Sequence, residues 1–348
     1  MKGPSDLILE YGSSSDPDVA GRREDSGTAM KILLLGEEAA GLQIFRMLAG
    51  GPHQLVAVMT SPSAGGSGPR GLWKAAESQG YAVWPAKLVK DPNFPQRIRT
   101  EGIEILLNIH SLIVLPPRIL EAPRFGCFNL RPAPLPRYAG LNSVSWAIYR
   151  GEVRHGVTLH RMTPEIDAGP IVYQALFEIA EGATAISVFT RCVKEGLPLV
   201  SKLLETADTT PENIPLLQQD LSLREYFDRA IPNDGRISWS SPARDIVNFV
   251  RSCDFLPFRS AWGHPRTNLN GEDLSVLKAN RTSQKCDCVP GTVGRPTASG
   301  VPVAASDEWV CLQHVMMAGC PLKAAEVLTA GSVLQDTPTS ERARTQHA

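Results

Sequence analysis

The sequence lacks any apolar run long enough to cross a membrane. None of its hydrophobic stretches approaches the ~18 residues that a transmembrane helix requires, and its first residues contain no continuous apolar segment of the kind found in signal peptides. We therefore expect a cytoplasmic protein that has no membrane partner.

The sequence also lacks a disulfide framework and a large net charge. The chain has seven cysteines, an odd number at irregular spacing, which is typical of free thiols in a reducing compartment. Cys286 and Cys288 form the one close pair, and no two further ligands lie near them, so we expect a loop and not a zinc site. The formal net charge of −1 provides no overall basic field for nucleic acid.

The first strand and helix do not carry a dinucleotide-binding fingerprint. Gly36 and Gly41 follow the apolar residues 31–35, but they do not form G-x-G-x-x-G. Two acidic residues, Glu37 and Glu38, stand where a pyrophosphate would need bare backbone amides. A nicotinamide cofactor is therefore disfavoured.

What the chain does have is enough apolar residues for two domains. Its 348 residues are 43% hydrophobic and 20% charged, as in ordinary globular proteins. Apolar strands at 31–36, 53–60, 103–109 and 126–130 alternate with helical patterns, which predicts an α/β domain with a doubly wound, mainly parallel sheet. Beyond residue 257, short runs separated by Gly and Asn predict a small antiparallel β-barrel.

These patterns predict five segments with distinct roles. We expect a disordered polar extension, an α/β domain, a linker with little packing, the barrel domain and a flexible tail, at residues 1–29, 30–205, 206–235, 236–334 and 335–348.

Polar residues follow several of the predicted strands, where ligands collect in open α/β sheets. They lie at 108–115, at 129–131 and at Asp167. Each also has a structural interpretation: Asn129 could cap its own loop, and Asp167 could be a turn residue before Ala-Gly. His155 and His160 alternate along a strand, and we expect them to be exposed or satisfied in the core.

Two central motifs resemble the folate-dependent formyltransferases. They read N-L-R-P-A-P-L-P-R-Y-A-G at 129–140, followed by W-A-I-Y-R-G-E, and G-V-T-L-H-R-M-x-x-x-x-D-A-G-P-I at 156–171. This family includes methionyl-tRNA formyltransferase, sugar-amine formyltransferases and a formyltetrahydrofolate hydrolase domain. The stretch R-I-S-W-S-x-P-A from residue 236 and the later P-G-T-V resemble the family's OB-like C-terminal domain. The barrel at 236–334 is therefore expected to be OB-like.

The resemblance implies that 10-formyltetrahydrofolate is the formyl donor and an amine the acceptor, without a metal. The family's site uses an Asn, a His two residues later and an Asp after the second strand. Asn129 and Asp167 match, but Arg131 replaces the His. We expect Asn129 and Arg131 to stabilise the oxyanion and Asp167 to act as the base. The residues expected to contact the folate are Ile109, His110, Ser111, Leu112, Ile113, Val114, Leu115, Pro132, Gly140 and Ile166.

Arg131 leaves two interpretations open. It can donate hydrogen bonds to an oxyanion, but it cannot carry a proton, and it would lower the pKa of a nearby Asp167. Alternatively, it binds an anion or pairs with Asp167, which would leave a folate-binding relative that is catalytically impaired. His110 could replace the missing imidazole, although a lone histidine is more often structural.

The acceptor is also open. A small-molecule amine, such as an amino sugar or a metabolite amine, is favoured over methionyl-tRNA, because the loop at 61–70 has a single basic residue and tRNA binding draws on many phosphate contacts. Water, which would make the protein a formyltetrahydrofolate hydrolase, is a further alternative. The sequence leaves both a monomer and a homodimer open.

Overall fold

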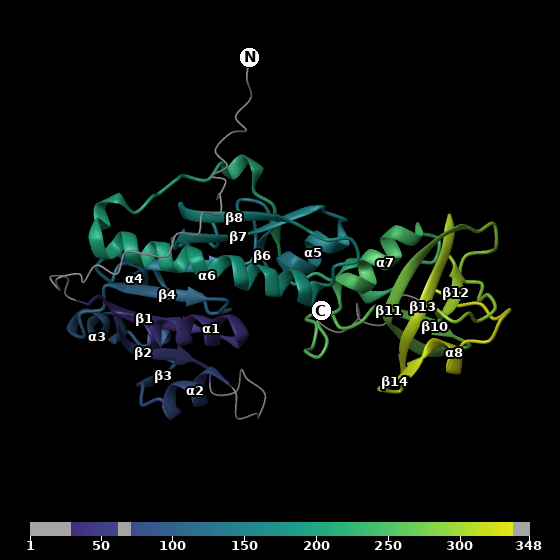
Figure 1. Cartoon of the computed structure of the whole chain (residues 1–348), viewed down its shortest axis with the longest axis horizontal. Helices are drawn as coiled ribbons and strands as arrows, with labels where there is room; N and C mark the ends of the chain where they lie inside the picture. Colours follow the sequence, from purple (N-terminus) through teal and green to yellow (C-terminus); the bar gives the residue numbers. More distant parts are fainter. Residues whose placement is uncertain (1–28, 62–70, 337–348) are drawn as a thin grey trace, which may run out of the picture.

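The computed structural model describes residues 29–61 and 71–336, which form two lobes joined side by side (Figure 1). The N-terminal lobe contains a seven-stranded sheet in the order β3-β2-β1-β4-β5-β7-β8. The bounds of these strands are β1 Lys31–Gly36, β2 Gln54–Thr60, β3 Val83–Pro85, β4 Ile105–Ile109, β5 Gly126–Arg131, β7 Arg154–Arg161 and β8 Ile171–Glu178.

The first five strands in this order are parallel, whereas β7 and β8 are antiparallel additions at one edge. Both faces of the parallel part are covered. In β1, Ile32 and Leu34 pack into one core, and Leu33 and Leu35 pack into a second core on the opposite face. Such continuous apolar strands are required when a sheet is buried on both sides. The mainly parallel, doubly wound sheet predicted from the sequence is confirmed.

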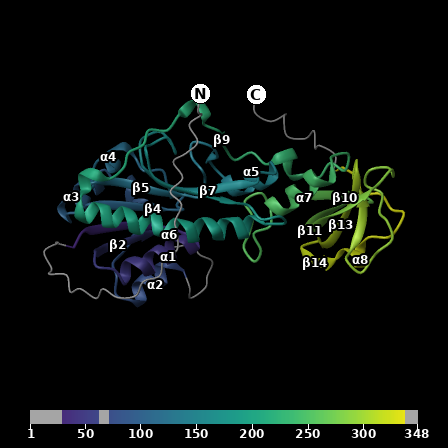
Figure 2. The same cartoon turned by 45° about the horizontal axis from the view of Figure 1, so that its top comes forward.

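Helices occupy both faces of the sheet. Helices α1, α2 and α6 contribute to the first core, and α3 and α4 contribute to the second. The long helix α6 begins beside the second lobe and extends along the sheet (Figure 2). The helices of this lobe are α1 Glu38–Ala49, α2 Leu72–Ser78, α3 Phe94–Thr100, α4 Pro117–Leu120, α5 Ser143–Tyr149 and α6 Ala185–Thr209, with a 3₁₀ turn at Ala86–Lys90.

The segment between the lobes packs more closely than the sequence suggested. We expected residues 206–235 to make few contacts, but β9 (Tyr226–Phe227) pairs in parallel with β6 (Ala139–Gly140). Leu217 forms a bridge with Ile171 at the start of β8. Composition alone could not show this, because these pairings are made by backbone groups, while the four leucines of the segment stay exposed. It also contains 3₁₀ turns at Pro211–Asn213, Leu221–Leu223 and Pro232–Gly235.

The C-terminal lobe is a five-stranded antiparallel sheet around its own core, as predicted. Its elements are α7 Ala243–Ser252, β10 Arg266–Leu269, β11 Glu272–Lys285, β12 Val301–Ala304, β13 Glu308–Met317, β14 Cys320–Lys323 and α8 Ala324–Val327. Across the described ranges, no helix has the length and apolar character needed to span a bilayer.

An aromatic cluster joins the two lobes. Trp146 on α5 stacks on Phe227 with ring centroids 4.8 Å apart, and it meets Trp262 of the C-terminal lobe edge-on at 4.9 Å. Tyr149 meets Phe249 on α7 at 5.4 Å. Offset and edge-on pairs of this kind add stability beyond their buried area, so the cluster holds the second lobe against α5.

Candidate active site

The end of β5 delivers two of the predicted residues into one cleft. Asn129 is opposite Asn108 on β4 and opposite His160 on β7, and its side chain is only 8% exposed. Arg131 follows at the last position of the strand. Because side chains two residues apart point to the same face of a strand, Asn129 and Arg131 both line the cleft.

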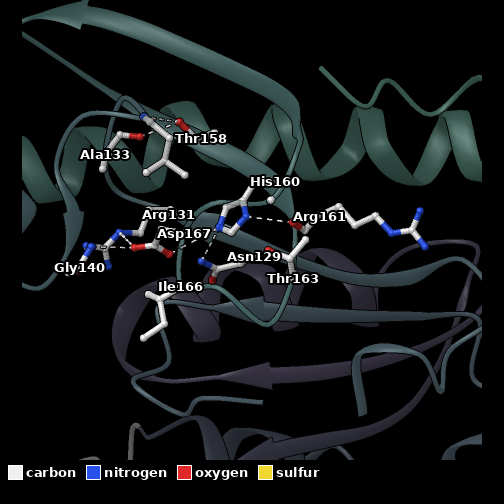
Figure 3. Close-up of polar contacts among 12 residues, drawn as sticks. Asn129, Arg131, Ala133, Gly140, Thr158, His160, Arg161, Thr163, Ile166 and Asp167 are labelled. Atoms are coloured by element: carbon white, nitrogen blue, oxygen red, sulfur yellow. Dashed lines mark hydrogen bonds and ion pairs between the residues drawn. The ribbon is translucent and has the colours of Figure 1, made fainter. Parts of the chain in front are cut away.

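Asp167 reaches the same place from the loop after β7. Its Oδ2 accepts a hydrogen bond from the backbone N–H of Gly140 at 2.9 Å and lies 3.2 Å from Nε of Arg131. Arg131 Nη2 donates to the carbonyl oxygen of Gly140 (Figure 3). The side chains of Asn129, Arg131 and Asp167 therefore converge, as the sequence predicted for the ends of these elements.

Gly140 occupies a position that only glycine fits. Its φ is +89°, and a Cβ atom there would lie 2.1 Å from the carbonyl oxygen of Phe227. The backbone of β9 approaches this closely because β6 and β9 pair at that point. The close approach fixes the N–H group that Asp167 uses.

The connecting segment also holds the Asp167 loop. Gln219 Nε2 donates to the carbonyl oxygens of Asp167, at 2.9 Å, and of Gly169, at 2.6 Å. Arg224 donates to the carbonyl oxygen of Ile166 and forms an ion pair with Glu165 at 3.1 Å. Asp167 has a φ of +56°, a conformation that costs free energy for a residue with a Cβ atom. The two bonds from Gln219 help to hold the loop in this strained conformation.

The charge on Asp167 is strongly stabilised. Burial by itself would raise the pKa of this carboxyl group, but the Arg131 guanidinium, the contact with His160 and the Gly140 N–H together lower it well below its usual range. Asp167 is therefore a carboxylate at neutral pH. The sequence predicted this effect of Arg131.

His160 is a site residue that the sequence analysis missed. Its Nε2 lies 3.0 Å from Nδ2 of Asn129 and 3.7 Å from Oδ1 of Asp167, and its ring is 2% exposed (Figure 3). We expected this side chain to be exposed or to have its hydrogen bonds satisfied in the core, and we did not expect it in the site. The antiparallel pairing of β7 with β5, which puts His160 opposite Asn129, was the missing information.

Most of the residues predicted to contact the folate line the same cleft, which has a volume of about 2230 Å³. Ile109 does not, because its side chain is fully buried in the core of the sheet. The loop that follows β4 presents apolar side chains, with Leu112 81% exposed and Val114 65% exposed. The predicted residues on the cleft wall are His110, Ser111, Leu112, Ile113, Val114, Leu115, Pro132, Gly140 and Ile166.

His110 is unlike the other members of this wall. Both of its ring nitrogens are buried and lack a hydrogen-bond partner among the described residues. Burial, followed by the charge of Arg131, lowers its pKa to about 3, and its ring lies edge-on to Phe189 of α6 at 5.0 Å. His110 is therefore neutral near pH 7, which argues against the hypothesis that it replaces the missing imidazole as a proton carrier.

The site is built from an amide, a guanidinium, a carboxylate and an imidazole. Among residues 29–61 and 71–336, no group of three or more His, Cys, Asp or Glu side chains is placed to hold a metal ion. An amide and a guanidinium can donate to a developing oxyanion, and a carboxylate and an imidazole can accept protons. The arrangement suits attack of a nucleophile on a carbonyl-type carbon.

Comparison with known protein families identifies both lobes. The model described as formyl transferase matches residues 49–202, and the model described as formyl transferase, C-terminal domain, matches residues 230–332. The chain is 26% identical over 311 residues to methionyl-tRNA formyltransferase of Thiobacillus denitrificans, covering 88% of this chain and 97% of the relative. It is 28% identical over 297 residues to methionyl-tRNA formyltransferase of Syntrophus aciditrophicus, covering 83% and 91%.

Solved structures with the same fold include two that contain folates. HypX from Aquifex aeolicus, in complex with tetrahydrofolic acid, has a TM-score of 0.62 at 17% identity over 86% of this chain, which spans about half of that protein (47%). WlaRD, a sugar 3N-formyl transferase solved with dTDP and 5-N-formyl-THF, has a TM-score of 0.62 at 18% identity, covering 90% of this chain and 100% of that one. At these identities, the likeness shows the fold alone.

Proposed function

Because this chain belongs to the formyl transferase family, we propose that it transfers a formyl group from 10-formyltetrahydrofolate to the amine of a small-molecule acceptor, an amino sugar or a metabolite amine. The observation that carries this proposal is the convergence of Asn129, Arg131 and Asp167 in one cleft. The donor is a co-substrate that is consumed and released as tetrahydrofolate.

The wall formed by the loop after β4 is suited to the donor. His110 and Asn108 contribute buried polar atoms that lack partners among the described residues. An unmade hydrogen bond of this kind costs about 1–3 kcal/mol, so a ligand with both donors and acceptors, such as a pterin ring, would be stabilised there. The exposed side chains of Leu112 and Val114 offer an apolar surface beside it.

Asn129 and Arg131 are proposed to stabilise the oxyanion. When the amine attacks the formyl carbon, negative charge grows on the formyl oxygen. Asn129 has an amide N–H for this oxygen, and Arg131 has Nη1, which has no hydrogen-bond partner within the described part of the chain. One such donor is worth about 3 kcal/mol in a comparable site.

Asp167 is proposed to receive the hydrogen bond of the attacking amine and to accept its proton as the C–N bond forms. The lowered pKa keeps this carboxylate ionised and ready to orient the amine. The same lowered pKa makes it a weak base, which holds the proton only briefly.

Methionyl-tRNA is the second candidate acceptor, and it is favoured by the names of the relatives that match across both lobes. Charge weighs against it. Residues 230–336 contain ten Lys or Arg and ten Asp or Glu, so this part of the chain has no net positive charge for a phosphate backbone. Most of the loop at 61–70, which has a single basic residue, lies outside the described residues.

The Arg131–Asp167 ion pair favours a third candidate, a relative that binds the folate but does not transfer its formyl group. Hydrolysis of the donor by water is a further alternative within the same site. In both cases the folate would bind, and no acceptor amine would be modified.

One experiment separates these candidates. The purified protein is incubated with 10-formyltetrahydrofolate and each member of a panel of amino sugars, metabolite amines and methionyl-tRNA. Mass spectrometry then detects the gain of one carbon and one oxygen atom on the acceptor, and a separate assay measures free formate. We expect gain on a small amine. Gain on tRNA alone, formate alone, or folate binding without any product would each support the corresponding alternative.

A cytoplasmic location is supported by the odd number and irregular spacing of the seven cysteines.

A further inference from the structure

His160 is in contact with two of the three predicted catalytic residues, and neither the family motif nor the sequence pattern assigns it a role. We propose that His160 carries the proton that formyl transfer moves from the acceptor amine to the departing folate nitrogen, replacing the imidazole that the family places where this chain has Arg131. This inference rests on the proposed function.

The contacts of the His160 ring indicate which of its two nitrogens carries the hydrogen and which accepts. Nδ1 lies 3.2 Å from the carbonyl oxygen of Arg161, which can only accept, so Nδ1 carries the hydrogen of the neutral ring. Nε2 is then the acceptor, and it receives the N–H of Asn129 at 3.0 Å. The lone pair of Nε2 therefore points into the site, toward Asn129 and Asp167.

Asp167 is placed to form an ion pair with a protonated His160. Its Oδ1 lies 3.7 Å from Nε2, while its Oδ2 is held by Gly140 and Arg131. A proton on Nε2 would form an ion pair with Oδ1. It would also displace the N–H of Asn129, which would then be available to the oxyanion at the moment when charge develops there.

The other groups around the ring are poor proton carriers. The guanidinium of Arg131, which faces the site from β5, donates hydrogen bonds and has no acceptor, and Asp167, from the loop after β7, has a lowered pKa. His110 at the end of β4 has a pKa of about 3. His155 has a pKa of about 4, mainly because of burial, and its Nε2 contacts the carbonyl oxygen of Pro132.

The proposed steps balance. The amine nitrogen attacks the formyl carbon, a C–N bond forms, and the carbonyl electron pair moves to the formyl oxygen. One proton leaves the attacking nitrogen along Asp167 Oδ1 to Nε2 of His160. The oxygen electron pair then re-forms the carbonyl, the bond from the formyl carbon to the folate N10 breaks, and N10 takes the proton back from His160. The products are the formamide and tetrahydrofolate.

The first test compares two buried histidines of the same strand. His160→Gln keeps a hydrogen-bond acceptor for Asn129 but cannot titrate, and His155→Gln is the matched control because His155 is equally buried and contacts neither Asn129 nor Asp167. We expect kcat/KM for formyl transfer to fall about 100-fold in His160→Gln, with one limb of its pH profile lost. His155→Gln should keep both limbs.

The second test uses position 131, where this chain has an arginine and the family motif a histidine. In an Arg131→His background, the carrier is present again, so His160→Gln should cost less than about tenfold. A purely structural role for His160 would give equal losses in both backgrounds, and an unchanged pH profile in His160→Gln would also overturn the inference. Circular dichroism and calorimetric binding of 5-formyltetrahydrofolate confirm that each variant folds and keeps its folate site.

The experiments distinguish a failure of the His160 role from a failure of the proposed function. If the wild-type protein transfers formyl groups and the His160 results are negative, only the role of His160 is wrong. If the wild-type protein modifies no amine in the panel, the proposed function fails, and this inference fails with it.

Discussion

Arg131 determines how this site differs from the motif it resembles. A guanidinium beside Asp167 holds that carboxyl group ionised and occupies the place of an imidazole. It supplies hydrogen-bond donors without being able to move a proton. In the mechanism that we propose, the adjacent His160 is the group that makes this substitution compatible with turnover.

Introducing histidine at position 131 should not damage the enzyme. We expect Arg131→His to transfer formyl groups at least as fast as the wild-type protein, because an imidazole can donate to the oxyanion and also carry a proton. Loss of the guanidinium should raise the pKa of Asp167 toward its usual range, which strengthens it as a base. Steady-state kinetics with the best acceptor amine provide the measurement.

The control at this position is Arg131→Leu, which removes both the donor and the charge. Its kcat should fall by about 10²-fold to 10³-fold, as for the loss of an oxyanion donor. A similar collapse in Arg131→His would mean that the arginine has a dedicated role of its own.

At the scale of elements, the sequence predicted the strands and the residues at their ends but not how the antiparallel edge is arranged. Apolar runs identified β1, β4 and β5, and the polar residues that follow them line the cleft. The pairing of β7 against β5 is a long-range property, so the position of His160 opposite Asn129 could not be predicted. Ile109 was also misplaced, since its side chain points from the end of β4 into the core.

The segment at 206–235 is the other element that sequence reasoning misjudged. Its polar composition is typical of a linker, yet its backbone pairs with Gly140 and its Gln219 side chain holds the loop of Asp167. Contacts made by backbone groups and amides leave no hydrophobic pattern in a sequence.

We predict that Gln219→Leu slows formyl transfer without unfolding the protein. Two hydrogen bonds to the carbonyl oxygens of Asp167 and Gly169 would be lost, and the carboxylate would no longer be held in its position. A misplacement of this kind should lower kcat about tenfold or more. Folate binding, measured by calorimetry, should persist because the loop after β4 is untouched.

The neighbouring glutamine provides the control. Gln218 is exposed, and no contact involving its side chain is seen within the described residues, so Gln218→Leu should retain wild-type kinetics. Equal kinetics in the two variants would show that the segment does not position Asp167.

At the scale of the whole molecule, two lobes with separate cores are joined through the aromatic cluster of Trp146, Phe227 and Trp262. The sequence predicted both lobes from the period of their apolar residues. It could not predict how they dock, because aromatic residues distant in the chain give no sign of which partners they will meet.

Buried neutral histidines should make the stability of this molecule depend on pH. His155 has a pKa of about 4 in the folded protein, compared with 6.5 for the free side chain. Between these values the unfolded chain binds more protons, so stability should fall as the pH decreases from about 7 to about 4. The loss from this one residue is on the order of a few kcal/mol.

Urea denaturation at several pH values tests this prediction with two variants. His155→Gln should flatten the dependence between pH 7 and pH 4. His314→Gln, which alters an exposed histidine on β13, should leave it unchanged. If His155→Gln and the wild-type protein lose the same stability over this range, the buried ring is not the source of the effect.

The most direct test of the account removes the charge at the centre of the site. Wild-type protein and Asp167→Asn are incubated with 10-formyltetrahydrofolate and the accepted amine, while folate binding is measured in parallel. We predict that Asp167→Asn binds the folate as tightly as the wild-type protein but forms the formamide at least about 10²-fold more slowly. Equal rates of formamide formation would contradict a mechanism in which Asn129, Arg131 and Asp167 act together.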